Sequence, residues 1–376
     1  MNILHVIPTY KPAYIYGGPI YSSSALCEQL VADGHKVTVL TTTANGEVEL
    51  DVPPGVAQNV DGVQTLYFKR VTKDNTNFSP DLVKYLYKNI KNYDAVHIHS
   101  WWNLVAIFTV LVCYIKRVRP VFSPRGMLCQ YILETNHPFQ KKIIQAVIGN
   151  RLLPKVKFHA TSTMEVHEIK GLYPKSQVEE IFNFVSVPEQ PAPEKAPIGD
   201  KIKFLFMSRI DPKKGLELLF KGLSMVQFPY ELTIAGPFKE DYVNQLKALT
   251  REYGIEAHVK WVGPVYGEAK FKLLHEHDVM VLTSYNENFA NIVIESLAMG
   301  TPVLISNMVG LSAYIAENKL GWISTIDPVN IKETLEKAYA ERDRLPELSK
   351  LAPILMKRDF DRKRLVNKYL DLYKSK

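Results

Sequence analysis

Cysteine is scarce in this sequence, and no hydrophobic run is long. The chain has 376 residues and only three cysteines. Cys27, Cys113 and Cys129 lie among apolar neighbours without the spacing of a metal site, so we expect buried, reduced thiols. The longest apolar run, NLVAIFTVLVCYI, ends at Lys116 and falls short of the roughly 18 to 20 residues that span a bilayer. The amino terminus, MNILHVIPTY, has neither a basic segment nor a small-residue cleavage site, so we expect no signal peptide. These absences predict a cytoplasmic protein.

The composition is ordinary for a globular protein and excludes disordered and fibrous classes, with 46% hydrophobic and 23% charged residues. The length favours two domains over one core. The net charge of +7 is modest, but nine Lys or Arg and one acid, Glu134, lie between Tyr114 and Lys157. This basic segment needs an acidic partner or a solvated face. Because no nucleic-acid recognition motif accompanies it, we expect no nucleic-acid partner.

Short apolar runs alternate with helical patterns in the first half. The strand NILHVI at 2–7, a Gly-Gly-Pro loop, a helix and the strand KVTVLTT at 36–42 form a β-α-β unit of a parallel sheet. Further strands are predicted at 95–99, 120–123 and 157–161, with helices over 103–116 and 138–153 between them. The pattern predicts a doubly wound α/β domain over residues 1–186.

A linker and a second α/β pattern follow. Residues 187–201, VPEQPAPEKAPIGDK, carry four prolines and no apolar periodicity, which is typical of a linker. A second alternation of strands and helices occupies 202–356, and an amphipathic helix is predicted over 357–376. We therefore predict two Rossmann-like doubly wound domains facing each other across a central cleft, with ligands at the carboxyl ends of the strands.

Cations and glycines follow the predicted strands of the second domain. The segment FMSRIDPKKG places Arg209, Lys213 and Lys214 directly after a strand, with Gly215 opening the next helix. Cations there, beside a helix amino terminus, suit a phosphate or diphosphate, and a solvated basic loop is the alternative. The strand-then-glycine turns LTIAGP, with Gly236, and VGPV let a backbone approach a ligand closely.

One carboxylate lies inside an apolar helical pattern. In NENFANIVIESLAMG, Glu295 is surrounded by apolar residues, and a buried carboxylate needs a compensating partner. Asn291 and Glu295 share a helix face, and Glu287 precedes the helix. A carboxylate at this place can accept hydrogen bonds from vicinal hydroxyls, as on a ribose, while Glu287 reaches another part of the same ligand. A buried structural ion pair is the alternative for Glu295.

Polar and aromatic residues also follow the strands of the first domain. His97 and His99 share one strand face in HIHSWW, and His99, at the carboxyl end, is a candidate for a substrate contact. Of Trp101 and Trp102, one is expected in the core and the other can form an aromatic platform. Arg125 follows the next predicted strand and faces the cleft.

The segment FHATSTMEV adds a strand-end polar group. It contains Thr161, Ser162 and Glu165. The spacing of Ser162 and Glu165 also suits a helix capping box, so a structural and a catalytic role remain open here.

These motifs together resemble a known family. ENFANIVIESLAMGTPVL is similar to the E-x7-E signature of retaining GT-B glycosyltransferases of family GT4 (glycosyltransferase group 1), and SRIDPKKG resembles the donor-diphosphate motif. HIHSWW and SPRGML…HATSTMEV fit the acceptor domain. The resemblance covers essentially the whole chain, with the motifs in the expected order. It implies an acceptor-binding domain over 1–186, a nucleotide-sugar domain over 202–356, and a helix 357–376 that packs back on the first domain.

The resemblance also implies an activity and roles for single residues. The chain is expected to move a hexose from a UDP- or GDP-sugar, with retention, to a glycan or polyprenyl-diphosphate-linked acceptor in bacterial surface polysaccharide biosynthesis. Arg209 and Lys214 would neutralise the departing diphosphate without a metal ion, so no metal or other cofactor is expected. The implied catalytic residues are His99, Glu287, Arg209 and Lys214. The implied donor-binding residues are Gly17, Gly18, Arg209, Lys214, Gly236, Asn288, Phe289, Ala290, Asn291, Ile292 and Glu295, with Glu295 on the ribose and Glu287 on the hexose. The implied acceptor-binding residues are Arg125, Trp101 and Thr161.

The chain departs from the family pattern at three positions. Asn288 and Ala290 stand where the family often has glycine, and Asn183 lacks the glycine that usually follows it. Side chains at Asn288 and Ala290 change the space around the donor sugar.

The basic helix predicted over 138–153 has two interpretations. One side carries Phe139, Ile143, Ile144, Val147, Ile148 and Leu152, and Lys141, Lys142 and Arg151 lie elsewhere. The helix either docks on an anionic bilayer at the inner face of the cytoplasmic membrane and admits a lipid-linked acceptor, or packs into the core.

Two other functions compete with glycosyl transfer. One is a GT-B-fold epimerase or hydrolase of nucleotide sugars, and the other is a non-catalytic module that binds sugar nucleotides.

Overall fold

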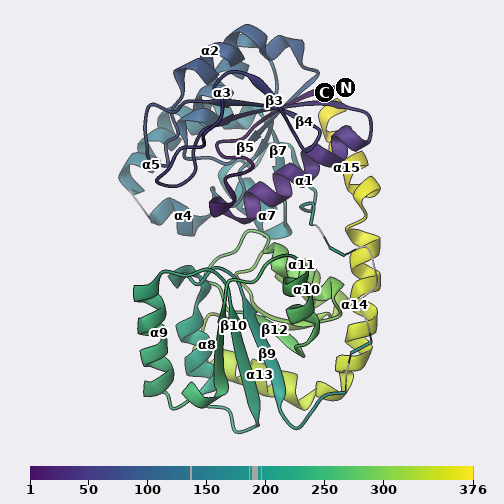
Figure 1. The fold of residues 1–376 in the computed structure, drawn as a ribbon. Coiled ribbons are helices and arrows are strands. Elements are labelled where there is room, and N and C mark those ends of the chain that lie inside the picture. Colours follow the sequence, from purple (N-terminus) through teal and green to yellow (C-terminus); the bar gives the residue numbers. More distant parts are fainter. Residues whose placement is uncertain (136–137, 186, 189–193, 196, 376) are drawn as a thin grey trace. The chain divides into compact units, whose positions relative to one another are not determined.

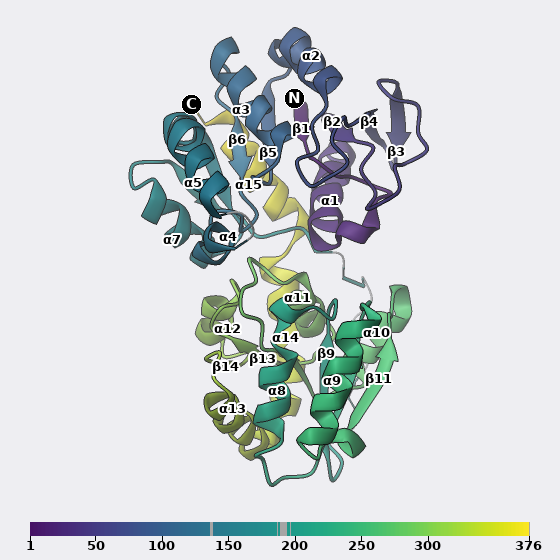
Figure 2. The same ribbon diagram turned by 90° about the vertical axis from the view of Figure 1, so that its left-hand side faces the viewer.

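The computed structural model describes residues 1–135, 138–185, 187–188, 194–195 and 197–375 (Figures 1 and 2). The chain divides into two compact units: Met1–Val185 with Arg362–Lys376, called the N-terminal unit, and Ser186–Asp361, called the C-terminal unit. The linker predicted over 187–201 lies in part outside the described residues, at 189–193 and 196.

An eight-stranded sheet forms the centre of the N-terminal unit, in the order β3-β4-β2-β1-β5-β6-β7-β8. All neighbouring strands pair in parallel except β3 and β4. The strands are β1 (Asn2–Val6), β2 (Lys36–Thr42), β3 (Ala57–Val60), β4 (Val63–Phe68), β5 (Ala95–His99), β6 (Val121–Ser123), β7 (Lys157–Ala160) and β8 (Val178–Glu180).

Helices cover both faces of this sheet, and each face has its own core (Figure 1). Because side chains alternate along a strand, Leu4 and Val6 pack on the side of α2 and α3, whereas Ile3 packs on the side of α1 and α15. The helices are α1 (Gly18–Ala32), α2 (Pro80–Asn89), α3 (Leu104–Lys116), α4 (Gln130–Glu134), α5 (Pro138–Ile144), α6 (Asn150–Leu152), α7 (Thr163–Leu172) and α15 (Arg362–Lys374).

The C-terminal unit contains a fully parallel six-stranded sheet in the order β11-β10-β9-β12-β13-β14. Its central strands are buried on both faces, which explains their continuous apolar sequences. The strands are β9 (Ile202–Met207), β10 (Tyr230–Ala235), β11 (Val259–Gly263), β12 (Val279–Leu282), β13 (Val303–Ser306) and β14 (Gly321–Ser324). The helices are α8 (Leu216–Leu223), α9 (Glu240–Glu252), α10 (Gly267–His275), α11 (Asn291–Ala298), α12 (Ser312–Asn318), α13 (Pro328–Ala340) and α14 (Leu345–Asp359).

Both sheets share one topology, which locates a binding edge in each. Counted in chain order, the strands from β4 to β7 and the strands from β11 to β14 both run 3-2-1-4-5-6. In such sheets ligands bind beyond the carboxyl ends of the strands, where the strand order reverses. The reversal falls between β1 and β5 in the N-terminal unit and between β9 and β12 in the C-terminal unit. The α/β architecture predicted from the sequence is confirmed.

Two predicted helices are interrupted in the structure. The helix expected over 138–153 contains a π-helical turn at Gln145–Gly149, where a Cβ on Gly149 would lie 2.7 Å from the Oε1 atom of Gln145. The helix expected over 357–376 starts only at Arg362, because residues 357–359 belong to the end of α14. Asp359, the last residue of α14, accepts a hydrogen bond from the Tyr314 hydroxyl at 2.7 Å. Within the described part of the chain, no helix is long and apolar enough to cross a membrane.

Candidate active site

The cations of the C-terminal unit lie where its strand order reverses. Arg209 follows β9, is exposed, and has no hydrogen bond or ion pair to any residue that the structure describes. Lys214 ends the 3-10 turn Pro212–Lys214, and only 9% of it is exposed. Its Nζ atom donates to the Oε1 atom of Glu287, which lies in the loop after β12. The side chains of this pair are 11% and 18% exposed.

The glycines at this edge allow the loops to approach one another. Gly215 has a φ of +64°, and a Cβ there would lie 2.3 Å from the carbonyl oxygen of Thr283. Gly236 has a φ of +147°, and its Cβ would lie 1.8 Å from the carbonyl oxygen of Ser208. The sequence predicted Gly236 as a place of close approach to a ligand, and the structure shows a close approach between the loops after β9 and β10.

The backbone of Glu287 is fixed by the loop after β13. Its N–H donates to the carbonyl of Met308 at 2.9 Å, and its carbonyl accepts from the N–H of Gly310 at 2.7 Å. Ala290 adopts the left-handed conformation, with a φ of +67° and a ψ of +77°, directly before α11. This conformation explains why glycine suits that position, because an L side chain is strained there.

The donor segment between Glu287 and α11 is mostly buried. Phe289 is 3% exposed and packs edge-on to Phe360, with ring centroids 6.3 Å apart. Asn288, Asn291 and Ile292 are partly buried. The structure therefore places these four predicted residues around the entrance to α11, with Phe289 in the interior.

Glu295 has the partner that its apolar surroundings required. The Nζ atom of Lys270, on α10, donates to the Oε1 atom of Glu295 at 2.7 Å. The side chains are 24% and 13% exposed. Lys270 was not predicted from the sequence, since no local spacing relates it to a residue 25 positions further on.

In the N-terminal unit, histidines meet at the reversal point of the sheet. His5 on β1 and His99 on β5 are buried, and the guanidinium of Arg125 donates to the Nδ1 atom of His99 at 3.2 Å. This leaves the proton of His99 on Nε2, which donates to the Nδ1 atom of His5 at 3.0 Å. His5 must then carry its proton on Nε2, which is buried and has no hydrogen-bond partner in the described part of the chain.

A second buried chain fixes His97 and His159. The Nε2–H of His159 donates to the carbonyl of Ile181 at 2.8 Å, so its Nδ1 accepts from the Ser123 hydroxyl at 2.6 Å. Since that hydroxyl has one proton, His97 donates to Ser123 through Nε2 at 2.6 Å. The Tyr373 hydroxyl, on α15, then donates to the Nδ1 atom of His97 at 2.9 Å.

These histidines are neutral at ordinary pH. Burial, with Arg125 as a further cause, lowers the pKa of His5 and of His159 to about 3. Burial also holds the pKa values of His97 and His99 well below their usual range. His5, His97 and His99 bring ligand atoms within 4.8 Å of one another, the one such group in the described residues. The adjacent guanidinium of Arg125 disfavours a metal cation there.

Arg125 lies among strained backbone positions. Ser100 and Trp102, after β5, and Arg125, after β6, have φ values of +70°, +51° and +58°. Such conformations cluster at functional sites in proteins. Arg125 also donates to the side chains of Asn183 and Ser22.

Glu165 joins the loops after β6 and β7. Its Oε1 atom accepts from the N–H of Gly126 at 2.7 Å, and its Oε2 atom accepts from the N–H of Thr161 at 2.8 Å. Ser162 caps α7 through the N–H of Glu165, but the carboxylate reaches Thr161 and not Ser162. Only half of the capping box predicted from the sequence is therefore present.

The remaining predicted residues of the N-terminal unit differ in exposure. Trp101 is 2% exposed and packs on Phe122, and Thr161 is buried. Gly17 has a φ of +75°, and Gly18 is exposed at the start of α1. Arg125 is partly exposed, so it is the most accessible of the three residues predicted to bind the acceptor.

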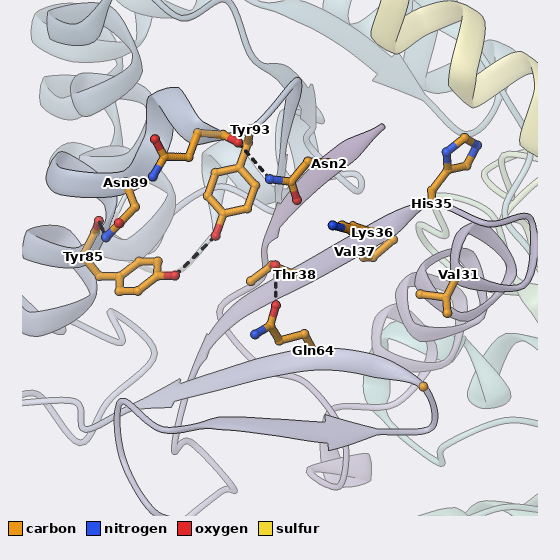
Figure 3. Close-up of a pocket in the computed structure, with 12 residues that line it drawn as sticks. Asn2, Val31, His35, Lys36, Val37, Thr38, Gln64, Tyr85, Asn89 and Tyr93 are labelled. Atoms are coloured by element: carbon orange, nitrogen blue, oxygen red, sulfur yellow. Dashed lines mark hydrogen bonds between the residues drawn. The ribbon is translucent and has the colours of Figure 1, made fainter.

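A pocket of about 460 Å³ lies elsewhere on the N-terminal unit (Figure 3). It is lined by residues at the amino ends of β1, β2 and β4, among them Asn2, Lys36 and Gln64. The hydroxyls of Tyr85 and Tyr93, 3.3 Å apart, lie on another side. Because it opens at the amino ends of the strands and contains none of the predicted residues, it is not the candidate active site.

The segment predicted as the basic helix has two apolar faces. Ile144 and Ile148 pack against the core, and Leu152 is 8% exposed. Phe139, Ile143 and Val147 are 74%, 48% and 54% exposed. Three of the six apolar residues named in the sequence therefore pack inside, and the other three face outward.

Solved structures of known proteins share this fold. Sucrose-phosphate synthase from Thermosynechococcus elongatus matches with a TM-score of 0.76 at 17% identity, over 99% of this chain and 98% of the other. HepE from Anabaena, solved with UDP and glucose, matches with a TM-score of 0.71 at 14% identity, over 99% and 98%. WaaG, a glycosyltransferase involved in lipopolysaccharide biosynthesis, matches with a TM-score of 0.69 at 14% identity, over 100% of both chains. The fold is that of the GT-B glycosyltransferases.

Comparisons of the sequence identify the family. Residues 16–187 match the model of Glycosyltransferase Family 4, and residues 189–352 match that of Glycosyl transferases group 1. An uncharacterized glycosyltransferase of Methanocaldococcus jannaschii is 24% identical over 91% of this chain and 90% of its own length. The chain belongs to the group 1 glycosyltransferases of family GT4, as its motifs predicted.

Proposed function

We propose that this glycosyltransferase moves a hexose from a UDP- or GDP-sugar, with retention of configuration, to a glycan or polyprenyl-diphosphate-linked acceptor in bacterial surface polysaccharide biosynthesis. The observation that carries the proposal is the cation pair of the C-terminal unit: exposed Arg209 and buried Lys214 lie at the reversal point of the strand order. Similar proteins add support, since HepE was solved with UDP and glucose and WaaG is involved in lipopolysaccharide biosynthesis.

Arg209 and Lys214 are proposed to stabilise the departing diphosphate. Negative charge grows on this group as the bond to the sugar breaks, and fixed cations stabilise that charge most in the transition state. Arg209 has five N–H donors available, and Lys214 has three, of which one contacts Glu287. We propose that this pair supplies the charge without a metal ion.

The two carboxylates and the α11 entrance are proposed to hold the rest of the donor. Glu295 would accept hydrogen bonds from the ribose hydroxyls, and Glu287, oriented by Lys214, from the hexose hydroxyls. Gly236 and the segment from Asn288 to Ile292 would contact the donor mainly through their backbone. Gly17 and Gly18 would approach the phosphates or the acceptor.

The N-terminal unit is proposed to bind the acceptor. Arg125, partly exposed and held by His99 and Asn183, is suited to contact an anionic acceptor, whereas buried Trp101 and Thr161 would shape the surroundings. His99 is proposed to lie near the reacting carbon. Because its pKa is lowered and both its nitrogens are engaged, it would act as a neutral group and not as a general base.

The experiment compares transfer by the wild type and variants over a panel of UDP- and GDP-sugars. Arg209→Ala is expected to lower kcat/KM by about 10²- to 10³-fold, as when a transition-state donor is removed. Arg251→Ala is the matched control, since that arginine lies on α9 and pairs with Glu256 at the surface. Release of free sugar as the main product would favour the hydrolase. Binding without turnover of any donor would favour the non-catalytic module.

The exposed stripe Phe139, Ile143 and Val147 is proposed to touch an anionic membrane. Its residues are spaced by four, and the segment 138–157 contains five Lys or Arg and no acid. Ile143→Ser is expected to weaken sedimentation with phosphatidylglycerol vesicles, and Ile354→Ser, an exposed apolar residue of the C-terminal unit, is the control. Equal sedimentation of both variants would contradict the membrane contact.

A further inference from the structure

Lys270 and Glu295 form an ion pair between two helices of the C-terminal unit. Lys270 lies in the first turn of α10, which follows the glycine turn after β11, and Glu295 lies one turn into α11. The Nζ and Oε1 atoms are 2.7 Å apart, and both side chains are more than three-quarters buried. The Oε2 atom of Glu295 has no hydrogen-bond partner among the described residues.

This pair differs from the surface pairs of the same unit. Lys272, two residues further along α10, contacts Glu276 at 3.8 Å, with side chains 76% and 51% exposed. Exposed pairs of this kind contribute little to stability. A largely buried pair loses hydration on both ions, so apolar residues of similar size often stabilise a protein equally well or better. Stability alone therefore does not explain Lys270.

We propose that Lys270 is a positioning residue for nucleotide recognition, an inference that rests on the proposed ribose role of Glu295. Lys270 holds the carboxylate in place through Oε1 and leaves Oε2 and the second lone pair of Oε1 for the vicinal ribose hydroxyls. With its two oxygens fixed in this way, the carboxylate can accept a hydrogen bond from each hydroxyl.

Lys270 also balances charge. A nucleoside diphosphate is an anion, and an uncompensated carboxylate beside it would lower the affinity by like-charge repulsion. Paired with Lys270, Glu295 contributes hydroxyl recognition with no net charge. The ligand class is thus a nucleoside diphosphate with an intact ribose, and the pair distinguishes it from a 2′-deoxyribose.

The test compares the Kd values of UDP and 2′-deoxy-UDP, and of GDP and 2′-deoxy-GDP, by calorimetry. The wild type is expected to prefer the ribonucleotide by about tenfold or more, the size of a hydrogen bond to a charged group. Glu295→Gln and Lys270→Met are expected to reduce this preference to about twofold or less. Lys270→Arg should restore most of it, and Lys272→Met, the control on the same helix, should leave it unchanged.

Other outcomes separate failure of the inference from failure of the proposed function. A preference lost in Glu295→Gln but kept in Lys270→Met would overturn the role of Lys270 alone. A wild type that binds no nucleotide, or does not distinguish ribose from deoxyribose, would overturn the ribose role of Glu295 and the inference with it. If Lys270→Met does not fold, as judged from its thermal transition, Lys270→Gln serves in its place with the same expected loss of preference.

Discussion

The two units place different chemistry at the same point of the same topology. Where the strand order reverses in the N-terminal unit, neutral imidazoles and hydroxyls bond mostly to one another, and most of their hydrogen-bonding capacity is used. At the corresponding point of the C-terminal unit, Arg209 is exposed, and Lys214 and Lys270 pair with carboxylates that retain further acceptor capacity. A neutral network whose donors and acceptors are mostly paired fixes the positions of its side chains. Cations that keep unpaired N–H donors attract an anion. Apart from Arg125, which bonds to His99 and Asn183, the first edge is therefore built for shape, whereas the second is built for charge.

The largest expected effect concerns charge in the C-terminal unit. Lys214→Met removes a donor from the departing diphosphate, and kcat/KM should fall by about 10²- to 10³-fold. Lys201→Met is the control, since Lys201 contacts Glu231 at the surface at 3.6 Å. Steady-state kinetics with the best donor of the panel provide the measurement. Near-wild-type turnover by Lys214→Met would contradict the claim that the strand-end edge of the C-terminal unit is built for charge.

The next effect concerns the loops that carry this charge. Gly236→Ala would place a Cβ 1.8 Å from the carbonyl oxygen of Ser208, which a backbone cannot accommodate without moving. We expect the free energy of unfolding to fall by about 3 kcal/mol, as for other strained or overpacked substitutions. Gly199→Ala is the control, because nothing lies within 4 Å of its Cβ. Chemical denaturation measures the free energy of unfolding of both variants. Equal values would show that the loops after β9 and β10 can move to accommodate the added Cβ.

Acid should destabilise the N-terminal unit more than the C-terminal unit. Burial lowers the pKa of His5 and His159 to about 3. The unfolded chain, with histidine pKa values near 6.5, binds protons first as the pH falls, so stability is lost from pH 6.5 down toward pH 3 and is unaffected above that window. Between pH 6.5 and 5, each such histidine should cost about 2 kcal/mol.

Hydrogen exchange of peptides from β1, β5 and β7, compared with peptides from β9 and β12, measures this difference after correction for intrinsic rates. The C-terminal unit contains His277, whose pKa is also lowered, mainly by burial. Acid should therefore reduce the protection of the C-terminal unit as well, but by less than that of the N-terminal unit. His5→Leu should shift the loss of protection to lower pH, and His167→Leu, at an exposed position, should not. Equal acid sensitivity of the two units would contradict the comparison.

The smallest effect is a gain in stability. Ala290→Gly relieves a left-handed backbone conformation, and the free energy of unfolding should rise by up to about 1 kcal/mol. Ala298→Gly, near the end of α11, should have the opposite sign and cost about 1 kcal/mol. Thermal unfolding measures the change in stability of each variant relative to the wild type. A loss of stability in both variants would show that the backbone at Ala290 is not strained.

Local patterns predicted much of the fold. The strands at 36–42 and 95–99 were predicted to the residue, because both runs are rich in the β-branched residues that favour strands. The hairpin of β3 and β4 was not predicted, since β3 is short and largely exposed. The strand β14 and the helices α12 and α13 were missed as well.

Contacts between distant residues could not be predicted in the same way. Lys214 and Glu287 were each identified, but their pairing joins residues 73 positions apart and depends on the reversal of strand order. His5 was missed although a signal was present: an uncompensated histidine within the apolar strand NILHVI. The tail pattern KRLVNKYLDLY predicted a helix but gave no sign that Tyr369 and Tyr373 would reach the histidines of β7 and β5.

The buried histidine chain also constrains how this protein can change over evolution. Its order of donors and acceptors is set at one end by the Ile181 carbonyl, which can only accept, so every proton between it and Tyr373 has a single arrangement. Loss of the Ser123 hydroxyl would leave both His97 and His159 with a buried nitrogen lacking a partner. We therefore expect positions 97, 123, 159 and 373 to be inherited as a set, so that in related sequences they are retained together or replaced together.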